Sequence, residues 1–201
     1  MRDSAEVITL ADGELHFWRD FFSADEAVSL FAKLRGETGW EQSHIRIAGR
    51  QIVIPRLNAW YGDRSADYSY SGVRLTTLPW TETLLNVKNR VESATHISFN
   101  SALVNLYRNE KDSVDWHSDD ERELGNGPQV ASVSLGETRC FELRRRNDHR
   151  QRFKLELPGG SLLLMGGTIQ HHWQHRVAKE KHPCGERVNI TFRWVHNSRC
   201  D

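Results

Sequence analysis

The sequence DWHSDDE at residues 115–121 decides the fold that we expect of this chain. If this segment is extended, side chains two residues apart point to the same side, so His117 and Asp119 can bind one metal ion while Ser118 faces away. A second imidazole, His175, lies far downstream, and the strands and turns of an antiparallel barrel would return it opposite the pair. The spacing therefore predicts a metal site inside a β-barrel.

The same three side chains indicate the class of metal. Two imidazoles and one carboxylate on one face of an ion leave the other coordination positions open, which is typical of non-haem Fe(II) that activates oxygen. Histidine is frequent, with ten in 201 residues, so a zinc site or a non-catalytic module is an alternative. Structural zinc needs a closed set of four ligands. The further donors available for it are His171, His172, His182 and Cys184.

Residues 187–195 alternate strictly between apolar and polar, which predicts a strand with two different faces. The apolar positions are Val188, Ile190, Phe192 and Trp194, and the polar positions are Arg187, Asn189, Thr191 and Arg193. A polar strand face ordinarily meets water. Because this strand follows His175 closely, we expect its polar face to line the metal cavity, with both arginines leaning on one small dianion. A dicarboxylate co-substrate fits this arrangement.

A second two-faced strand is expected at residues 101–107. One face carries Ala102, Val104 and Leu106, and the other carries Leu103, Asn105 and Tyr107. Asn105 and Tyr107 would add an amide and a phenol to the carboxylate pocket, although a strand tyrosine is more often a packing residue.

These segments follow, in order, the signature of a known family. The matching stretches are PRL at 55–57, AWYG at 59–62, NLY at 105–107, DWHSDDE at 115–121, ASVSLG at 131–136, GSLLLM at 160–165, WQH at 173–175 and RVNITFR at 187–193. Over residues 40–195 the chain resembles the AlkB dioxygenases, Fe(II)- and 2-oxoglutarate-dependent enzymes that remove alkyl groups from nucleic-acid bases. The resemblance implies a mainly β, α+β fold: a double-stranded β-helix, or jelly-roll barrel, with flanking N-terminal helices and a nucleotide-recognition lid.

Carried over position by position, the resemblance implies the roles of the site residues. His117, Asp119 and His175 would be the iron ligands. Arg193, together with Tyr107, would bind the far carboxylate of 2-oxoglutarate. Arg187, Asn189 and Asn105 would contact the co-substrate closer to the metal, and Thr191 belongs to the same binding set. With molecular oxygen, such a site would convert 2-oxoglutarate to succinate and carbon dioxide and release a base-bound methyl group as formaldehyde.

The implied substrates suggest where the base would bind. In 1-methyladenine and 3-methylcytosine the ring carries a positive charge, which carboxylates and aromatic faces favour. Asp120 and Glu121 are therefore candidates, and solvated loop acids are the alternative. Upstream of the metal ligands, aromatic and basic residues are mixed, as stacking on bases and pairing with phosphates requires. The candidates there are Tyr68, Tyr70, Arg56, Trp60 and Tyr61.

One position in this lid bears on strand preference. Residues 45–54 predict a hairpin with Ala48-Gly49 near its turn. Where the duplex-repairing member of the resembled family has a bulky aromatic wedge, this chain has Ala48. Extruding a paired base costs a few kcal/mol, and least when the strand is already single. We therefore expect single-stranded DNA or RNA as the partner. A hydroxylase of a protein or small molecule, in which the lid is incidental, is the other reading.

The expected organisation is one dioxygenase domain over residues 1–201, with helices and lid in about 1–100 and the jelly-roll core in about 101–195. Ser23 and Glu26 form the pattern of a capping box, which predicts a helix that ends at Gly36. A second helix is expected from near Thr81 to Glu92.

Composition bounds the remaining expectations. The net charge is zero, so binding of nucleic acid should depend on a few local contacts rather than on many phosphates. The one dense basic cluster, Arg144 to Arg146, is expected in a solvated turn. Three scattered cysteines favour a reducing compartment, which is the cytoplasm (and the nucleus in a eukaryote). Because the sequence has no long apolar run, we expect no membrane partner. We expect a monomer.

Overall fold

The computed structural model describes residues 4–47, 50–63, 69–70, 73–74 and 77–196. Its larger sheet has eight strands in the order β1-β2-β14-β11-β16-β9-β5-β8. These strands are β1 (Glu6–Leu10), β2 (Gly13–Trp18), β14 (Ser161–Met165), β11 (Val130–Gly136), β16 (Arg187–Arg193), β9 (Ser101–Tyr107), β5 (Leu57–Gly62) and β8 (Thr77–Leu78). All neighbouring pairs are antiparallel except β5 and β8, which are parallel.

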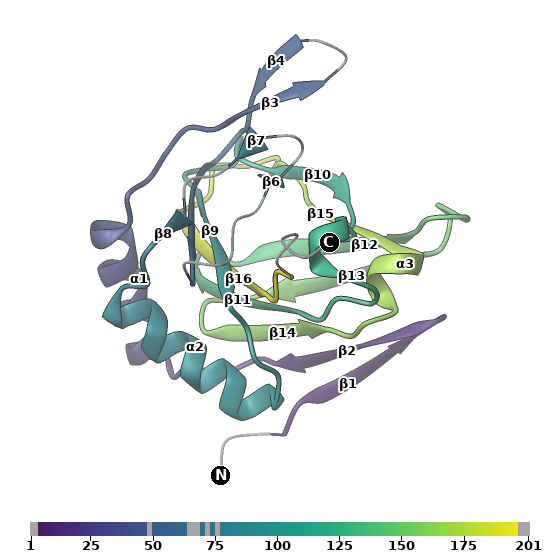
Figure 1. Cartoon of the computed structure of the whole chain (residues 1–201), viewed down its shortest axis with the longest axis horizontal. Helices are drawn as coiled ribbons and strands as arrows, with labels where there is room; N and C mark the ends of the chain where they lie inside the picture. Colours follow the sequence, from purple (N-terminus) through teal and green to yellow (C-terminus); the bar gives the residue numbers. More distant parts are fainter. Residues whose placement is uncertain (1–3, 48–49, 64–68, 71–72, 75–76, 197–201) are drawn as a thin grey trace.

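The smaller sheet has four strands in the order β10-β15-β12-β13. They are β10 (Val114–His117), β15 (Trp173–Val177), β12 (Arg139–Arg145) and β13 (Arg152–Leu157), and every pair is antiparallel. Figure 1 shows this sheet beside β9, β16 and β11 of the larger one. The mainly β, α+β architecture with two facing sheets agrees with the predicted fold class.

Two helices cover the outer face of the larger sheet (Figure 1). In α1 (Ala24–Glu37), the Ser23 hydroxyl accepts from the Glu26 backbone N–H, and the Glu26 carboxylate accepts from the Ser23 N–H, so the capping box is formed. The helix passes the predicted end at Gly36 by one residue, ends at Glu37 and has Thr38 as its C-cap. In α2 (Glu82–Thr95), Thr81 caps the start, where the helix was predicted to begin, and the helix continues past the predicted end at Glu92.

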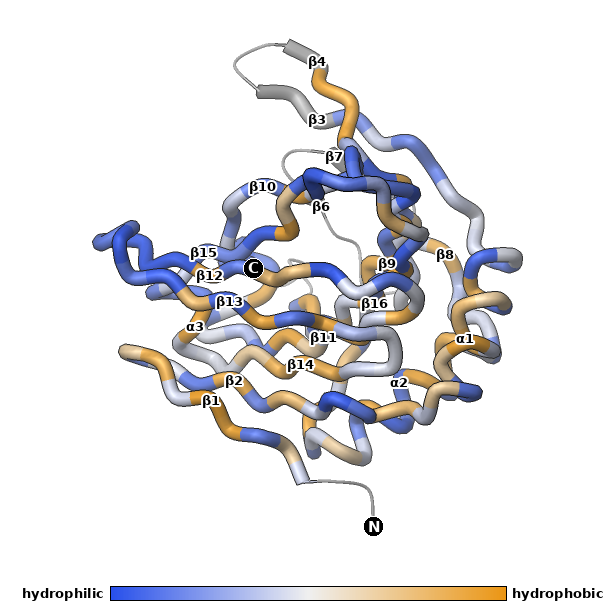
Figure 2. Tube along the Cα trace, turned by 180° about the vertical axis from the view of Figure 1, so that it is seen from behind, coloured by the Kyte–Doolittle hydropathy of each residue, from blue (hydrophilic) through white to orange (hydrophobic). Residues whose placement is uncertain are grey.

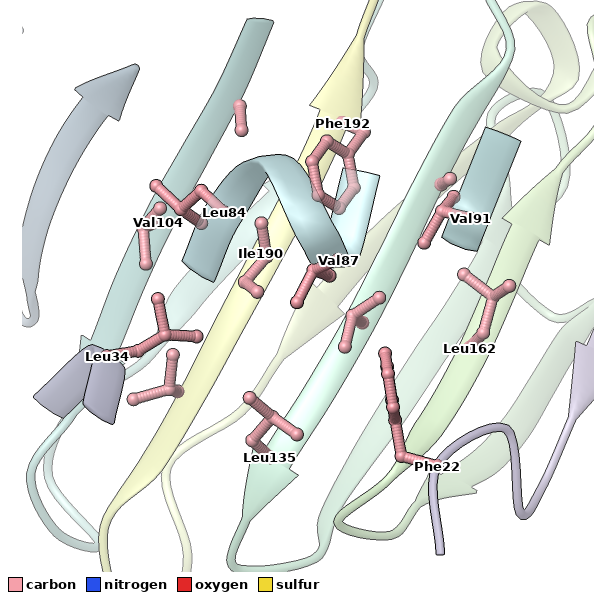
Figure 3. Packing of buried hydrophobic residues seen from close by; sticks show 14 of the residues in the cluster. Phe22, Leu34, Leu84, Val87, Val91, Val104, Leu135, Leu162, Ile190 and Phe192 are labelled. Carbon is pink, nitrogen blue, oxygen red and sulfur yellow. The ribbon is translucent and has the colours of Figure 1, made fainter. Parts of the chain in front are cut away.

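The main core lies between these helices and the sheet. Figure 3 shows Leu34, Leu84 and Val87 from the helices packed against Ile190 and Phe192 of β16. Because side chains alternate along a strand, the residues of β16 that alternate with these two point to the opposite face of the sheet, toward the smaller sheet. The helices therefore fix which face of β16 is apolar and leave its polar residues to the interior between the sheets.

A second apolar cluster fills the interior between the sheets on one side of that polar face. Its members include Phe17, Tyr107, Phe141, Leu163 and Trp173, which come from both sheets. The polar side chains of β16 and β9 therefore lie in a closed interior rather than in water. A short helix, α3 (Ile169–His172), leads into β15, and a 3₁₀ turn at Arg122–Leu124 follows the loop after β10.

The division between the first hundred residues and the barrel differs from the prediction. About residues 1–100 were expected to supply helices and a lid; in addition, β1, β2, β5 and β8 from this part belong to the larger sheet. The segment of β5 lacks the alternation that marks a strand with one wet face, because all but its first residue are buried. A strand that is covered on both faces shows a continuous apolar run instead of alternation. Such a run is easily mistaken for another kind of segment.

Two small hairpins stand at one end of the barrel (Figure 1). They are β3–β4 (His44–Ile47 and Arg50–Val53) and β6–β7 (Ser69–Tyr70 and Val73–Arg74). The predicted hairpin over 45–54 is confirmed in its two arms, while the turn at Ala48-Gly49 lies outside the described residues. On the arm of β4, Ile52 and Val53 are exposed, and Figure 2 shows this stretch as hydrophobic. Among the described residues, none of the helices is both long and apolar enough to cross a membrane.

Candidate metal and co-substrate site

The three predicted metal ligands converge. Strands β10 and β15 pair so that His117 lies opposite His175, with ring centroids 4.2 Å apart. One ligand atom from each of His117, Asp119 and His175 can be chosen so that all three atoms lie within 4.8 Å of one another. Among the described residues, this is the one such group of His, Cys, Asp and Glu side chains. The antiparallel pairing predicted from the spacing therefore does bring the distant histidine back.

Neighbouring backbone and side chains orient two of the three ligands. His117 Nδ1 lies 2.8 Å from the Asp115 carbonyl oxygen, which directs Nε2 toward the group. The strand ends at His117 rather than continuing, and the Asp119 backbone N–H donates to Gln170 Oε1 at 2.9 Å. Ser118 turns away from the group, as predicted, and donates to the Trp173 carbonyl oxygen. The loop between the first two ligands is thus held from the opposite strand and its leading helix.

The carboxylate of Asp119 is buried at 1% exposure and has a strong partner on one side only. Arg193 Nη2 donates to its Oδ1 at 2.8 Å. Its Oδ2 has no hydrogen-bond partner and lies 3.9 Å from His175 Nε2. A buried carboxylate oxygen without a donor is costly. A cation bound between the two imidazoles would satisfy it, so the residues present fit a metal ion.

The electrostatics favour the protonation states that a metal requires. Burial, aided by the nearby His117, lowers the pKa of His175 to about 3, and burial also lowers the pKa of His117. For Asp119, burial alone would raise the pKa, but Arg193 and the two imidazoles outweigh it and lower the pKa to about 2. Neutral imidazoles and an ionised carboxylate at neutral pH are the forms that bind a divalent cation without first losing protons.

A second centre of charge lies at the other end of the same pocket. Arg187 is 1% exposed, and its guanidinium carbon lies 5.1 Å from the centroid of the Tyr107 ring. Its Nη2 donates to the Ser134 hydroxyl at 2.9 Å, while Nε and Nη1 have no hydrogen-bond partner. Burial lowers the pKa of Arg187 to about 10, which still leaves it charged. A buried cation with unused donors indicates an anion-binding position.

The structure reverses the order of the two arginines. Tyr107 lies opposite Arg187 in the pairing of β9 with β16, whereas Arg193 lies opposite Ser101 at the far end of the strand. The predicted pairing of Arg193 with Tyr107 is therefore wrong, because Arg193 contacts the metal ligand Asp119. It is Arg187, predicted near the metal, that lies at the distant end. Alternation showed which face these residues share but not which end of the strand meets the metal.

Polar side chains between the two ends complete the pocket. Asn189 donates to the Ser132 hydroxyl at 2.8 Å, and the Thr191 hydroxyl donates to Asn189 Oδ1 at 3.0 Å. Asn105 Oδ1 accepts from Arg56 Nε at 2.8 Å. The pocket is lined by every residue that was predicted to bind the metal or the co-substrate: Asn105, Tyr107, His117, Asp119, His175, Arg187, Asn189, Thr191 and Arg193. Arg56, which was predicted to bind substrate, lines it as well.

The substrate-binding role predicted for two aromatic residues is wrong. Trp60 and Tyr61 are only 2% and 3% exposed and belong to apolar clusters of the core. Neither side chain can stack on a base while it packs there. Tyr68 lies outside the described residues, and of Tyr70 only the backbone position in β6 is described.

The acidic candidates lie at the surface beside the metal loop. Asp120 is exposed and accepts from Arg146 Nη1 at 2.5 Å, so it is ion-paired rather than simply solvated. Glu121 is half-buried and precedes the 3₁₀ turn. Asp120 is thus held at a fixed place next to a metal ligand.

The basic cluster is also more ordered than a solvated turn. Arg144 and Arg145 belong to β12 and only Arg146 lies in the loop that follows. The Arg144 guanidinium lies 4.4 Å from the ring centroid of Trp116, and Arg145 forms an ion pair with Asp12. Figure 2 shows the end of the β12–β13 hairpin as hydrophilic, but each of the three arginines has a partner.

Gln170 and Ser134 are residues of the site that the sequence did not reveal. Gln170 is fully buried, and it holds the backbone of Asp119 from the short helix α3. A single glutamine in a four-residue helix carries no recognisable pattern. Ser134 lies on β11 in a stretch that matched the family signature, although no role was attached to it.

The zinc alternative finds no support in the described residues. The group of possible ligands holds three side chains, and none of the further donors belongs to it. His171, His172 and His182 are exposed, and Cys184 is half-buried with a free thiol. A set of three ligands with an anion-binding arginine in the same pocket is the arrangement of an open catalytic site rather than of a closed structural one.

The fold and this site define a class of protein. The chain belongs to the 2OG-Fe(II) oxygenase superfamily, whose family model matches residues 14–193. Within it, the chain belongs to the AlkB family. It is 36% identical over 184 residues to the DNA oxidative demethylase ALKBH2 of Mus musculus, covering 87% of this chain and 77% of that protein.

Higher identities occur with another branch of the family. The alpha-ketoglutarate-dependent dioxygenase alkB homolog 3 is 46% identical in Bos taurus and 45% identical in Homo sapiens, over 88% of this chain. The chain covers 64% of the length of each of these two proteins.

Solved structures agree with the fold. The structure of OsALKBH1 superposes with a TM-score of 0.65 at 18% identity, covering 94% of this chain and 100% of that chain. A prolyl hydroxylase from Trichoplax adhaerens superposes with a TM-score of 0.62 at 14% identity, covering 94% and 86%. At these identities the likeness shows the double-stranded β-helix fold alone.

Proposed function

We propose that this protein is an Fe(II)- and 2-oxoglutarate-dependent oxidative demethylase of N-methylated bases in nucleic acid. The observation that carries the proposal is the shared pocket: the His117, Asp119 and His175 group lies at one end and the buried Arg187 guanidinium lies at the other. A 2-oxo dicarboxylate has a metal-chelating end and a distant charged end, and the pocket offers a partner for each. The relatives described as DNA oxidative demethylases support the reaction type.

Each polar residue of the pocket has a part in holding the co-substrate. Arg187 binds the far carboxylate, with the Tyr107 phenol beside it. Asn105 and Asn189 line the middle, and Thr191 fixes the amide orientation of Asn189 through its hydroxyl. At the metal end, Arg193 keeps the Asp119 carboxylate ionised and oriented.

The bound iron and 2-oxoglutarate, with molecular oxygen, supply the oxidation that turns an N-methyl group into a hydroxymethyl group, which leaves as formaldehyde while succinate and carbon dioxide form. The part of the protein is to bind the metal and keto acid, to exclude water from their pocket and to place the methyl group at the metal.

The proposed substrates are 1-methyladenine and 3-methylcytosine in single-stranded DNA or RNA. Asp120, which adjoins the metal ligand Asp119 and is held by Arg146, would face the cationic base. The hairpins β3–β4 and β6–β7, at one end of the barrel, would form the lid over the nucleotide (Figure 1). The preference for a single strand rests on the sequence alone, which has the small Ala48 near the predicted turn of the hairpin.

The remaining expectations follow the same reasoning. We propose that residues 1–201 form one catalytic domain that acts as a monomer in a reducing compartment, the cytoplasm or nucleus. The free thiols of Cys140 and Cys184 are compatible with such a compartment, which also keeps iron in the ferrous state.

Formaldehyde release tests this function directly. Purified protein with Fe(II), ascorbate and 2-oxoglutarate is incubated with an oligonucleotide that carries one 1-methyladenine or 3-methylcytosine, either alone or annealed to its complement. We expect formaldehyde and succinate in equal amounts, dependence on both Fe(II) and 2-oxoglutarate, and faster turnover of the single strand. Succinate without any formaldehyde from methylated DNA or RNA would point instead to a hydroxylase of another substrate. Faster repair of the duplex would overturn the strand preference alone.

A further inference from the structure

A second buried arginine lies beside the anion-binding end of the pocket. Arg139 on β12 is 1% exposed, and its guanidinium carbon lies 5.6 Å from the centroid of the Tyr107 ring. Arg187 approaches the same ring at 5.1 Å from β16. One tyrosine ring therefore has a guanidinium from each of the two sheets within contact distance.

The hydrogen bonds of Arg139 fix its position but do not use all its donors. Its Nη2 donates to the carbonyl oxygens of Asp112 and Ala178, at 3.1 and 2.5 Å, and its Nε donates to Glu180 Oε1 at 3.1 Å. Its Nη1 is buried and has no hydrogen-bond partner. The side chain is thus held rigidly and keeps one donor available.

The local charge is not balanced. Two buried guanidiniums lie at the Tyr107 ring, and Glu180 is the one carboxylate that pairs with either of them in the described residues. That carboxylate is partly exposed, with 37% of its side chain accessible, so water weakens its effect. Uncompensated buried charge is expensive, and it persists where a ligand of opposite charge repays it.

We infer that Arg139 is a positioning and specificity residue for the far carboxylate of the keto acid, acting through the Tyr107 ring and through its charge. This inference rests on the proposed function, because it assumes that a 2-oxo dicarboxylate binds the pocket. Arg139 holds the Tyr107 ring in place beside Arg187 and the far carboxylate. It also adds a second positive charge to the anion-binding end of the pocket. Its consequence is selection: a dicarboxylate gains from Arg139, and a monocarboxylate of equal chain length does not.

Binding to the Mn(II)-loaded protein, which does not turn over, tests the inference. Dissociation constants are measured by calorimetry for 2-oxoglutarate and for 2-oxopentanoate, which has the same chain without the far carboxylate. In Arg139→Gln we expect 2-oxoglutarate to bind about tenfold more weakly, as loss of one charged contact predicts, while 2-oxopentanoate binding changes by less than about twofold. Arg139→Lys keeps the charge and should recover part of the affinity. Arg152→Gln, at an exposed position of β13, is the matched control and should change neither constant.

Two further measurements separate this role from a structural one. In turnover, Arg139→Gln should raise KM for 2-oxoglutarate with kcat nearly unchanged at saturation. Glu180→Gln removes the competing carboxylate, so it should leave 2-oxoglutarate binding unchanged or tighter. If instead Glu180→Gln weakens binding as much as Arg139→Gln does, the arginine serves only as an internal ion pair and the inference is overturned.

The outcomes also separate the inference from the function beneath it. An equal loss of affinity for both keto acids, or no loss for either, overturns the role of Arg139 while the unmodified protein still binds 2-oxoglutarate. Failure of the unmodified Mn(II)-loaded protein to bind 2-oxoglutarate overturns the proposed function and, with it, the inference. Should Arg139→Gln fail to fold, Arg139→Lys decides. Weaker binding of 2-oxoglutarate with unchanged binding of 2-oxopentanoate supports the role, whereas no loss for either keto acid, or an equal loss for both, overturns it.

Discussion

Arg193 Nη2 donates to Oδ1 of Asp119 at 2.8 Å, and both side chains are buried. The arginine comes from the last position of β16 in the larger sheet, and the aspartate comes from the loop after β10 in the smaller one. This ion pair therefore joins the two sheets at the metal ligand itself. It also shows that the polar face of β16 runs from the metal end, at Arg193, to the anion-binding end, at Arg187.

Removing Arg193 should destabilise the metal-free protein more than the metal-loaded one. In Arg193→Met, the Asp119 carboxylate loses its buried partner, which costs about 3 kcal/mol or more. A bound divalent ion supplies a replacement charge, so Mn(II) should recover much of the loss. Urea unfolding with chelator and with saturating Mn(II) measures both values. Equal destabilisation in the two states would show that the arginine does not act through the metal ligand.

Acid should destabilise the metal-free protein through His175. Its pKa is about 3 in the folded protein against 6.5 for an ordinary histidine, so between these values the unfolded chain binds a proton that the folded chain does not. The free energy of unfolding must then fall as the pH is lowered from 6.5 toward 3, by at most about 1.4 kcal/mol per pH unit for this group. Urea unfolding with chelator at pH 7 and 5 measures it. His175→Gln should flatten the dependence, whereas His182→Gln, at an exposed position, should not.

Gln170 should control metal affinity without touching the metal. In Gln170→Leu the Asp119 backbone N–H loses its acceptor inside the protein, a loss worth about 1–3 kcal/mol. We expect Mn(II) to bind about five- to tenfold more weakly, because the loop that carries the carboxylate is no longer held. Gln174→Leu, whose side chain accepts from Arg144, is the control and should bind Mn(II) normally. Normal Mn(II) binding by both variants would show that Gln170 does not support the metal site.

Trp60 should matter for stability rather than for base recognition. Trp60→Ala empties a buried position and should lower the free energy of unfolding by about 3–5 kcal/mol. Trp194→Ala, at an exposed position, should change it by less than about 0.5 kcal/mol. Chemical unfolding provides the comparison. A Trp60→Ala protein of normal stability that had lost only oligonucleotide affinity would reinstate the stacking role.

Asp120 should contribute to the binding of the methylated base and not to the binding of the co-substrate. Asp120→Asn removes the charge that would face a cationic ring, so KM for a 1-methyladenine oligonucleotide should rise about tenfold. The affinity of the Mn(II)-loaded protein for 2-oxoglutarate should stay unchanged. Arg146→Gln, which frees the carboxylate from its ion pair, should not raise KM in the same way. If the two variants behave alike, the pair has only a structural role.

Much of the site was predictable from local patterns. The alternation in β16 and β9 showed which side chains share a face, because a strand has a period of two. The spacing of His117 and Asp119 indicated one metal-binding face before any strand pairing was known. Local patterns could not show which of the two arginines lies at the metal end of the pocket and which at the anion-binding end. They depend on the register that places Tyr107 opposite Arg187, and register is set by long-range pairing rather than by the local sequence.

Other residues were misassigned for a physical reason. Trp60 and Tyr61 lie in β5, a strand that is buried on both faces, so their aromatic character reflects packing. A mixture of aromatic and basic residues is expected both in a base-binding lid and in a covered strand with charged neighbours, so composition alone does not distinguish the two. Gln170 and Arg139 were missed because each acts through a tertiary contact, with the Asp119 backbone and with the Tyr107 ring, that no local pattern encodes.

We propose that a ferrous ion and a 2-oxo dicarboxylate bind together in one pocket, with Arg187 at the far carboxylate. An anaerobic titration of the Fe(II)-loaded protein with 2-oxoglutarate, followed by visible absorption, tests it most directly. We predict a charge-transfer band that requires both components, that is lost in His175→Ala and that needs much more 2-oxoglutarate to develop in Arg187→Gln. A protein that binds Fe(II) but gives no band, or a band with the same 2-oxoglutarate dependence in Arg187→Gln, would show that the two ligands do not share the pocket in this way.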